Sequence, residues 1–314
     1  MQSLFPNLAP VRNAEPFLNW LGGKRQLLHE IQHYYPLHAG YEATTFIEPF
    51  IGGGAVFFDI MKTHDFDRII INDLDSNAIN AYRVVKNNVD EYITAIQQEQ
   101  SLYDNKSYDG KSEHYYAART EFNNLLPEEN PLRKAVLAIF LNRVSFNSLY
   151  RMNTKGEMNA SWSKDTRAFN VDFENLKTVS HILNTPGVII ENRSYDELFE
   201  YFDDKTFAFF DPPYRAISKT ANFNKYGNGT VQEKWDDTTQ LHLRDFVNSV
   251  NSLGTKFLMT NSDPKNTVPE DDFFDDLYAD YSIHRVPASR KISVKSSTRK
   301  GVNELFISNI ERKI

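Results

Sequence analysis

Short apolar runs that end in a polar or acidic residue recur along the chain and predict buried strands. The clearest run occupies residues 207–210, where three of the four residues are phenylalanine, and Asp211 follows it directly. The others occupy residues 45–48, 68–72, 187–192, 256–260 and 304–310. Runs that are apolar at successive positions are typical of strands covered on both faces, as in the parallel sheets of α/β proteins.

Segments with apolar residues at helical spacing separate these predicted strands. They occupy residues 27–34, 75–86, 115–126, 131–142 and 241–253. The segment at 131–142 is apolar on most faces, so we expect a buried helix there. Residues 97–114 are polar and short of large aliphatic side chains. Residues 221–230 are rich in glycine and asparagine, and this composition predicts a mobile loop there. Alternating strands and helices predict an α/β fold.

The composition is that of a soluble globular protein, with 40% hydrophobic and 25% charged residues. There is no cysteine, which excludes disulfides, thiolate metal sites and the attacking thiol of carbon-5 cytosine methylation. The first residues lack a basic start and a long apolar core, and the apolar run at 135–141 is far too short to span a membrane. We therefore expect a cytoplasmic protein without a membrane partner.

The net charge of −7 argues against nucleic acid as a partner, but the basic residues are concentrated in two segments. Residues 131–168 contain two acids, Glu157 and Asp165, and the basic residues Arg133, Lys134, Arg143, Arg151, Lys155, Lys164 and Arg167. Residues 285–300 contain no acid and the basic residues Arg285, Arg290, Lys291, Lys295, Arg299 and Lys300. These segments suit phosphate binding, and two solvated faces are the alternative interpretation.

A stiff loop follows the strand predicted at 207–210. Asp211 is followed by Pro212 and Pro213, which cannot continue a hydrogen-bonded ladder, and then by Tyr214. The loop presents a carboxylate, main-chain carbonyls and an aromatic ring at the carboxyl end of a strand, where open α/β sheets bind their ligands. Two acceptors beside an aromatic face suit a planar amine.

Two glycine turns provide candidate binding sites. Gly22-Gly23-Lys24 precedes a predicted helix and offers free amides and a cation to an anionic group. Residues 52–54 are three glycines that follow the strand at 45–48, and Asp73 ends the next strand. A glycine loop with an acid at the end of the next strand is how α/β proteins hold a nucleoside.

Two further patterns carry alternatives. His29-Glu30-Ile31-Gln32-His33 fits the H-E-x-x-H pattern of zinc peptidases, but no third ligand stands out, so we interpret both histidines as surface residues. Residues 146–159 predict an irregular hairpin with its turn at Lys155-Gly156. Its mixture of polar, basic and apolar side chains suits base-edge contacts and an apolar wedge, and a plain surface hairpin is the alternative.

Six motifs, in this order, resemble the Dam-type adenine methyltransferases, including the DpnM-like enzymes of restriction systems. They are Trp20-Leu21-Gly22-Gly23-Lys24, Glu48-Pro49-Phe50-Ile51-Gly52-Gly53-Gly54, Asn72-Asp73, Leu141-Asn142-Arg143 with Asn147-Ser148-Leu149-Tyr150-Arg151, Asp211-Pro212-Pro213-Tyr214, and Ser297-Thr298-Arg299-Lys300. The resemblance spans nearly the whole chain. It implies an α/β, seven-stranded S-adenosylmethionine-dependent methyltransferase (Rossmann-like) sheet with a helical target-recognition insertion. The catalytic domain would comprise residues 1–75 and 173–314, and the insertion residues 76–172.

The resemblance also implies a function, the transfer of a methyl group from S-adenosylmethionine to an adenine flipped out of double-stranded DNA. The residues that would carry the transfer are Asp211, Pro212 and Tyr214. The residues that would bind the cofactor are Trp20, Lys24, Phe50, Gly52, Gly54, Asp73, Ser194, Tyr195 and Asp211. The residues that would contact DNA are Asn19, Arg143, Phe146, Asn147, Leu149, Arg151, Lys155, Ser161, Arg299 and Lys300. No metal is implied. Single-stranded DNA as a second substrate, an accompanying nuclease and the oligomeric state stay open.

The recognition residues depart from the family pattern at three positions. Asn19 stands where a lysine commonly reads the first guanine of GATC, Ser161 where a proline contacts a thymine methyl, and Phe146 where a tyrosine wedge is usual. Arg151 and Leu149 are kept, and arginine reads guanine through its two major-groove acceptors. We therefore expect GATC or a near relative, with the first base least determined.

Two other functions are compatible with the same motifs. The first is the same chemistry on RNA, cytosine or a glutamine side chain, although an aspartate at position 211 favours adenine. The second is a DNA-binding regulator that keeps the fold without catalysis, against which the intact glycine loop, Asp73 and Asp211 argue.

Overall fold

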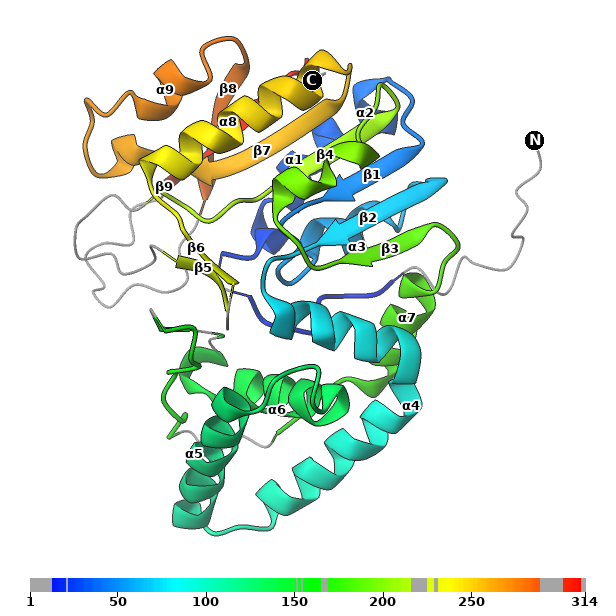
Figure 1. Ribbon diagram of the computed structural model, residues 1–314, viewed down its shortest axis with the longest axis vertical. Coiled ribbons are helices and arrows are strands. Elements are labelled where there is room, and N and C mark those ends of the chain that lie inside the picture. The colour runs from blue at the N-terminus through cyan, green and yellow to red at the C-terminus, as the bar shows by residue number, and fades with distance from the viewer. Residues whose placement is uncertain are drawn as a thin grey trace.

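Seven strands form one mixed sheet in the computed structural model, in the order β3-β2-β1-β4-β7-β9-β8 (Figure 1). The structure describes residues 13–20, 22–148, 150, 152–153, 155–164, 169–215, 225–228, 231–288 and 302–311. The strands of the sheet are β1 Thr45–Glu48, β2 Arg68–Asn72, β3 Val188–Glu191, β4 Thr206–Phe210, β7 Lys256–Ser262, β8 Ser282–Ala288 and β9 Val302–Ser308. The expected α/β fold with a seven-stranded sheet is confirmed.

The five strands from β3 to β7 in that order are parallel, and β9 is antiparallel to both β7 and β8. All six apolar runs of the sequence correspond to strands, and β4 lies between β1 and β7 near the middle of the sheet. The sequence prediction missed β8. This strand has only one buried residue, contains Pro287 and lies at the edge of the sheet, where a proline is tolerated.

Helices cover both faces of the sheet and bury its apolar runs. On one face, Phe46, Ile69 and Phe207 pack with the short helices α1 Leu28–Ile31, α2 Pro36–Ala39 and α3 Ala55–Ile60. On the other, Ile47, Ala208 and Phe257 pack with η4 Tyr195–Tyr201, α8 Asp237–Ser252 and α9 Phe273–Leu277. Figure 1 shows α8 across the near face. Burial on both faces explains why the runs are apolar at every position rather than at alternate ones.

Four helices, α4 Ser76–Asp104, α5 Tyr108–Asn124, α6 Pro131–Val144 and α7 Phe173–Leu183, make up most of the remaining structure. Figure 1 shows α4, α5 and α6 together below the sheet, and the core under the sheet continues into α4, α6 and α7. The expected buried helix at 131–142 is confirmed as α6.

Sequence reasoning assigned no element to the polar segment at 97–114, whereas in the structure α4 continues to Asp104 and α5 already begins at Tyr108. Beyond a kink at Asn88, the buried stripe of α4 comprises Tyr92, Ile93, Ile96, Glu99 and Tyr103. This stripe has helical spacing but contains a glutamate and two tyrosines, so a search for aliphatic side chains overlooks it.

Two other predictions need correction. The helix expected at 27–34 is divided into α1 and the 3₁₀ turn η2 Gln32–Tyr34, and another 3₁₀ turn, η1 Lys24–Gln26, precedes it. The loop expected at 221–230 contains β5 Lys225–Asn228, which pairs antiparallel with β6 Val231–Lys234 as a separate two-stranded sheet. Among the described residues, no helix combines the length and apolar character required to cross a membrane.

A buried ionic cluster joins the three helices below the sheet and yields a stability prediction. The Glu99 carboxylate in α4 is hydrogen-bonded to His114 in α5 and to Arg133 in α6, and Arg133 also pairs with Glu121. Burial alone would raise the pKa of Glu99, but hydrogen bonds from His114 and Arg133 lower it below its ordinary value of 4.5. The ionised carboxylate therefore stabilises the fold above that value, and this contribution is lost as the pH falls through the lowered pKa.

We expect Glu99→Ala to lower the free energy of unfolding by about 3 kcal/mol at pH 7, because it removes the buried carboxylate to which Arg133 and His114 are hydrogen-bonded. Urea denaturation measures this loss, which should shrink below about pH 4 as the wild-type carboxylate becomes protonated. Glu121→Ala serves as the control, because Glu121 is exposed and its loss should cost less than about 1 kcal/mol. Equal losses for the two variants would contradict this description of the cluster.

Candidate active site

A hydrogen-bonded network surrounds Asp211 at the carboxyl end of β4. Asp211 Oδ1 accepts from Lys24 Nζ and Thr260 Oγ1, each at 2.8 Å. Lys24 Nζ also donates to the Tyr214 hydroxyl at 2.7 Å and to the Gly22 carbonyl at 2.9 Å, so all three ammonium protons are used. The Tyr214 hydroxyl in turn donates to Glu304 Oε2 at 2.8 Å. Asp211 is thus oriented through one oxygen.

The second carboxylate oxygen of Asp211 is available to a ligand. Within the part of the chain that the structure describes, Oδ2 of Asp211 accepts no hydrogen bond, and the side chain is 21% exposed. Lys24 is only 3% exposed, so it contacts the Asp211 carboxylate from the protein interior. The site therefore offers a fixed, accessible acceptor beside the ring of Tyr214, as the sequence predicted for a planar amine.

Burial and neighbouring charged groups shift the pKa values of the ionisable side chains in this network. Burial alone would lower the pKa of Lys24, but Asp211, Tyr214 and Glu304 raise it overall, so Lys24 is a cation at neutral pH. Burial raises the pKa of Glu304 above its ordinary value of 4.5, with Lys24 opposing the shift. Glu304 and Thr260 belong to the site through β9 and β7, and sequence reasoning missed both. No local pattern marks either residue.

Arg215 fastens the loop where it leaves the site. Its guanidinium donates to both carboxylate oxygens of Asp237 at 2.7 and 3.0 Å and to Asp271 at 2.7 Å, and it lies 4.0 Å from the ring centroid of Phe273. The Gln240 side chain of α8 donates to the Pro213 carbonyl at 3.2 Å. These contacts add to the two prolines in keeping the loop rigid.

The glycine loop after β1 is held by Asp73, Tyr82 and Trp20. Asp73 Oδ2 accepts from the Gly52 amide at 2.8 Å, and the Tyr82 hydroxyl donates to the Gly52 carbonyl at 3.2 Å. Gly52 has a φ of 45°, and a Cβ there would lie 2.8 Å from the Trp20 indole, so the close approach of that indole requires glycine. Gly54 also has a positive φ, 74°. The Trp20 ring stacks on Tyr150 with centroids 4.9 Å apart.

Asp73 is buried, and its other oxygen accepts from the Asp75 amide at 2.9 Å. In this structure, therefore, the carboxylate expected to hold a ribose organises the glycine loop. A carboxylate accepts about four hydrogen bonds, so this use of Asp73 is compatible with additional contacts to a ligand.

Glu48 is a further acid of the site to which sequence reasoning assigned no role. It ends β1, is 2% exposed, and its Oε2 has no hydrogen-bond partner among the described residues. Burial raises the pKa of Glu48 well above its ordinary value, and Asp211 and Asp73 add to the shift. A buried carboxylate oxygen without a partner suits a cationic ligand group. The signal was present in the sequence, because Glu48 ends an apolar run as Asp211 does.

The loops that follow β1, β2 and β3 meet around three aromatic rings. Phe50 lies 5.5 Å from Tyr195 and 5.7 Å from Trp235, measured between ring centroids. The Asn72 side chain donates to the carbonyls of Pro49 and Arg193 at 2.9 and 3.0 Å, which ties the loops together. Ser194 begins η4 in a capping box with Glu197. The structure thus brings Phe50, Ser194 and Tyr195 to one edge of the sheet, and adds Trp235, which sequence reasoning missed.

The hairpin predicted at 146–159 is confirmed in the part that the structure describes. Met152 and Met158 form an antiparallel bridge, and the Asn153 amide donates to the Glu157 carbonyl at 2.8 Å around the turn at residues 155–156. Phe146 begins η3 Phe146–Ser148 and is 57% exposed. Asn147 and Ser148 follow with backbone φ angles of 57° and 52°, and positive values are unusual for residues other than glycine. Phe146, Asn147, Lys155 and Ser161 are all exposed.

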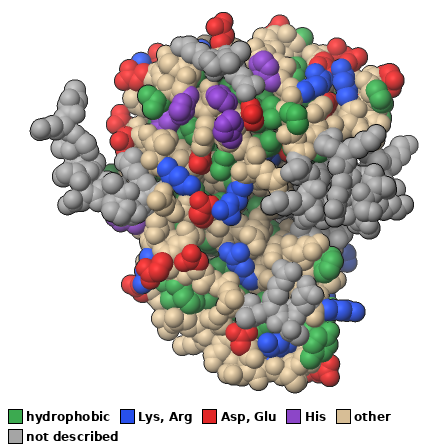
Figure 2. All heavy atoms as spheres, turned by 180° about the vertical axis from the view of Figure 1, so that it is seen from behind, with side chains coloured by type: hydrophobic (Ala, Val, Ile, Leu, Met, Phe, Trp, Pro, Cys, Tyr) green, Lys and Arg blue, Asp and Glu red, His purple; other side chains and the backbone are tan. Residues whose placement is uncertain are grey.

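Several members of the two basic segments are engaged within the protein. Arg143 donates to the Phe17 carbonyl at 2.8 Å, and burial lowers its pKa. The Lys134 ammonium is buried and donates to the Phe122 and Leu125 carbonyls. Arg285 pairs with Asp263 and Asp275. The expectation that the two segments face phosphates is therefore wrong for Lys134, which is buried, while Arg285 is partly exposed and already paired with two carboxylates. On the face seen in Figure 2, the basic side chains that are described lie among acidic ones.

Some predicted residues lie outside the described residues. They are Leu21, Leu149, Arg151, Arg299 and Lys300. His29 and His33 are described, with ring centroids 5.5 Å apart. Among the described residues, no group of three histidine, aspartate or glutamate side chains is arranged to hold a metal ion, so the zinc-peptidase pattern has no structural support.

Comparison with known proteins identifies similar chains over nearly the whole length. The family model "D12 class N6 adenine-specific DNA methyltransferase" matches residues 20–292. The Type II methyltransferase M.MjaIII of Methanocaldococcus jannaschii is 34% identical over 298 residues, which cover 94% of this chain and 99% of that protein. The Type II methyltransferase M1.LlaDCHI of Lactococcus lactis subsp. cremoris is 31% identical, covering 95% and 96%. The DNA adenine methylase of Escherichia coli (strain K12) is 30% identical over 290 residues, covering 92% and 93%.

Proposed function

The chain belongs to the D12 class of N6 adenine-specific DNA methyltransferases, and from this premise we propose that it methylates the amino group of an adenine flipped out of a short DNA site. The observation that carries the proposal is the orientation of Asp211. Lys24 and Thr260 hold one of its oxygens, and the other is open to the amine of a flipped base. Methyl transfer to adenine in DNA is the activity of the family, and the residue roles below are our proposals.

S-adenosylmethionine is the methyl donor that fits the residues of the site. It is a sulfonium with an ammonium group and would supply an activated methyl group when bound. The partnerless oxygen of Glu48 would face a positive group of this molecule, because a cation bound beside the glycine loop would favour ionisation of this buried carboxyl group. Phe50 and Tyr195 would flank its adenine with Ser194, while Trp20, Gly52 and Gly54 would line the methionine part and Asp73 the ribose.

Lys24 was expected to bind the cofactor, and we propose a different role for it. Its three protons are used by Asp211, Tyr214 and the Gly22 carbonyl. We therefore assign Lys24 to the orientation of Asp211 and Tyr214 from below. In this position its charge also offsets those of Asp211 and Glu304, whose carboxylate oxygens lie 2.8 and 3.7 Å from Nζ.

The reaction follows from the poor nucleophilicity of the adenine amine, whose lone pair is delocalised into the ring. Hydrogen bonds from the amine to Asp211 Oδ2 and the Pro212 carbonyl would localise the lone pair on nitrogen, while the ring stacks on Tyr214. The hydrogen bond between Tyr214 and Glu304 limits rotation of that ring. Most of the rate enhancement would come from positioning and electrostatic preorganisation.

DNA recognition would depend on the α4–α6 region and the N-terminal segment. We propose the division into a catalytic domain, residues 1–75 and 173–314, and a recognition insertion, residues 76–172. The boundaries fall beside the N-cap residues Asp75 of α4 and Asp172 of α7. Asn19 would read the first base, Phe146 would insert into the stack, and Asn147, Lys155 and Ser161 would contact the duplex. GATC or a near relative is the site that we propose.

A duplex with 2-aminopurine at the target position tests the flipping step, because this base fluoresces more strongly when unstacked. With S-adenosylhomocysteine present, we expect wild-type protein to raise the fluorescence of a GATC duplex, or of a variant changed at the first base. Phe146→Ala should reduce this rise at least about fivefold, since the exposed ring is lost as a wedge. Phe199→Ala, which removes another exposed phenylalanine from η4, is the control. No rise with any first-base variant would contradict the proposed recognition.

A further inference from the structure

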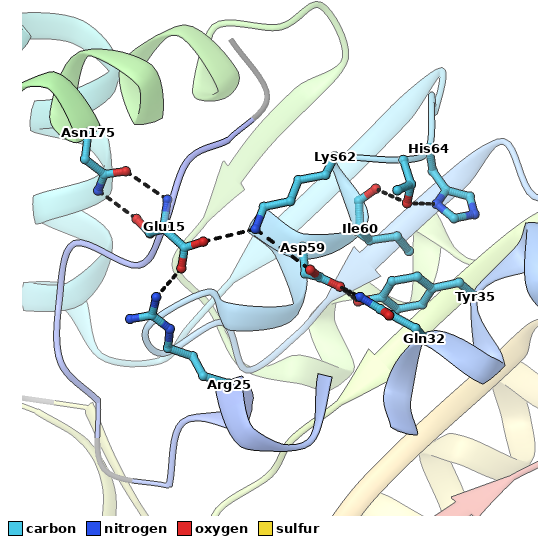
Figure 3. Close-up of polar contacts among 10 residues, drawn as sticks. Glu15, Arg25, Gln32, Tyr35, Asp59, Ile60, Lys62, His64 and Asn175 are labelled. Atoms are coloured by element: carbon cyan, nitrogen blue, oxygen red, sulfur yellow. Dashed lines mark hydrogen bonds and ion pairs between the residues drawn. The ribbon is translucent and has the colours of Figure 1, made fainter. Parts of the chain in front are cut away.

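Asparagine side chains hold the N-terminal segment by pairing with both the amide and the carbonyl of one residue. Asn142 in α6 accepts from the Asn19 amide at 2.9 Å and donates to the Asn19 carbonyl at 2.8 Å. Asn175 in α7 makes the same pair of bonds with Glu15, at 2.8 and 2.9 Å (Figure 3). Each pair mimics one step of a β-ladder and spans more than a hundred residues of sequence.

The two pairs differ in what else they touch. The Asn142 side chain is 0% exposed, and its Nδ2 lies 3.4 Å from the Ser148 carbonyl, so it stands between Asn19 and the Phe146–Ser148 turn. Among the described residues of this segment, the Asn175 side chain is hydrogen-bonded to Glu15, which is also held by Arg25 and by Lys62 at 3.0 Å (Figure 3). Asn142 is therefore the side chain that links two of the elements proposed to meet DNA.

We propose that Asn142 is a positioning residue for recognition of the DNA site, which sets the place of Asn19 relative to the Phe146–Ser148 turn. This inference rests on the proposed function. A side chain discriminates between bases only when its hydrogen bonds reach the base edge with correct geometry. The backbone of Asn19 is fixed to α6 at both its polar groups, and the turn that carries Phe146 begins directly after the same helix.

Loss of the Asn142 hydrogen bonds should affect recognition alone, because Trp20, the residue after Asn19, is held by other contacts. Its ring stacks on Tyr150 and packs against residues 52 and 53 of the glycine loop. The reacting groups at Asp211 are held by Lys24, Thr260 and Arg215's contacts with Asp237, none of which involves Asn142. Loss of the Asn142 bonds should therefore change which bases are accepted more than it changes the transfer step.

The test measures kcat/KM for methyl transfer on duplexes that carry each of the four bases at the first position, and on a second set changed at the last position. For Asn142→Ala we expect the preference at the first position to fall roughly tenfold or more, which corresponds to losing one bidentate base contact. The preference at the last position and the KM for S-adenosylmethionine should stay within about twofold of wild type. Asn142→Gln keeps the amide group but displaces it, so this variant should show the same loss of first-position preference. It replaces Asn142→Ala in the test if Asn142→Ala does not fold.

Asn175→Ala is the matched control, since it removes an identical pair of bonds from the same segment. It should lower stability to urea and leave the first-base preference unchanged. Equal changes in both variants, or a uniform loss on every duplex for Asn142→Ala, would overturn the proposal for Asn142. A wild-type enzyme that methylates all four first-base duplexes equally would instead contradict the proposed reading of that base by Asn19.

Discussion

Asp211→Ala is expected to lower kcat for methyl transfer by at least about a thousandfold while DNA affinity stays within about threefold. The reason is that Asp211 is the accessible carboxylate of the site, oriented by Lys24 and Thr260 at 2.8 Å through one oxygen. Removing a preorganised hydrogen-bonding group of this kind typically costs a factor of about 10² to 10³, and here the partner also localises the nucleophilic lone pair. The variant also leaves the buried Lys24 cation without its nearest counterion.

Single-turnover transfer of a labelled methyl group measures the loss, and fluorescence anisotropy measures DNA binding. Asp272→Ala is the control, because Asp272 is an exposed acid that pairs with Lys265 rather than with Lys24, Thr260 or Arg215. Urea denaturation verifies that the Asp211 variant is folded. If the folded Asp211→Ala variant retained turnover, the proposed catalytic role of Asp211 would be wrong.

Glu48→Gln is expected to weaken binding of S-adenosylmethionine at least about tenfold and, at the same time, to stabilise the ligand-free protein at neutral pH. The carboxyl group binds its proton more tightly in the folded than in the unfolded chain, because burial raises its pKa. Its ionisation therefore lowers stability as the pH rises above the ordinary value of 4.5. Glutamine has no such charge, and its carbonyl can still accept from the Phe57 amide as Glu48 does.

Calorimetry and urea denaturation between pH 5 and 8 separate the two effects. Binding of the cationic cofactor to wild type should strengthen as the pH rises and Glu48 ionises, whereas binding to Glu48→Gln should depend less on pH. A charged hydrogen bond typically contributes about 1.5–3 kcal/mol, which sets the expected loss of affinity. Unchanged affinity in the variant would mean that Glu48 does not face the cofactor, whatever its effect on stability.

The parallel strands and their terminal acids were predictable because burial on both faces leaves a local trace in the sequence. The runs ending at Glu48, Asp73 and Asp211 lie on adjacent parallel strands, so their acids meet at one edge. The local patterns also singled out Lys24 and Tyr214, which the structure places within hydrogen-bond distance of one another.

The remaining parts of the site depend on pairing between distant segments. Glu304 reaches Tyr214 because β9 inserts antiparallel between β7 and β8, with Glu304 opposite Ser262. Nothing local to Glu304 predicts this register. The use of Lys24 was also not predictable, since a lysine after two glycines suits an anionic ligand as well as it suits Asp211. The interior of α4 escaped prediction because Glu99 occupies a core position that only its partners His114 and Arg133 make tolerable.

The most direct measurement is to incubate the purified protein with S-adenosylmethionine and unmethylated genomic DNA, and to map the methylated bases by sequencing. The account predicts N6-methyladenine at one short motif, GATC or a near relative, with the first base of the motif revealing what Asn19 reads. Absence of methyladenine from the DNA, with cofactor binding demonstrated on the same preparation, would contradict the proposal that the Asp211 site accepts an adenine flipped from DNA.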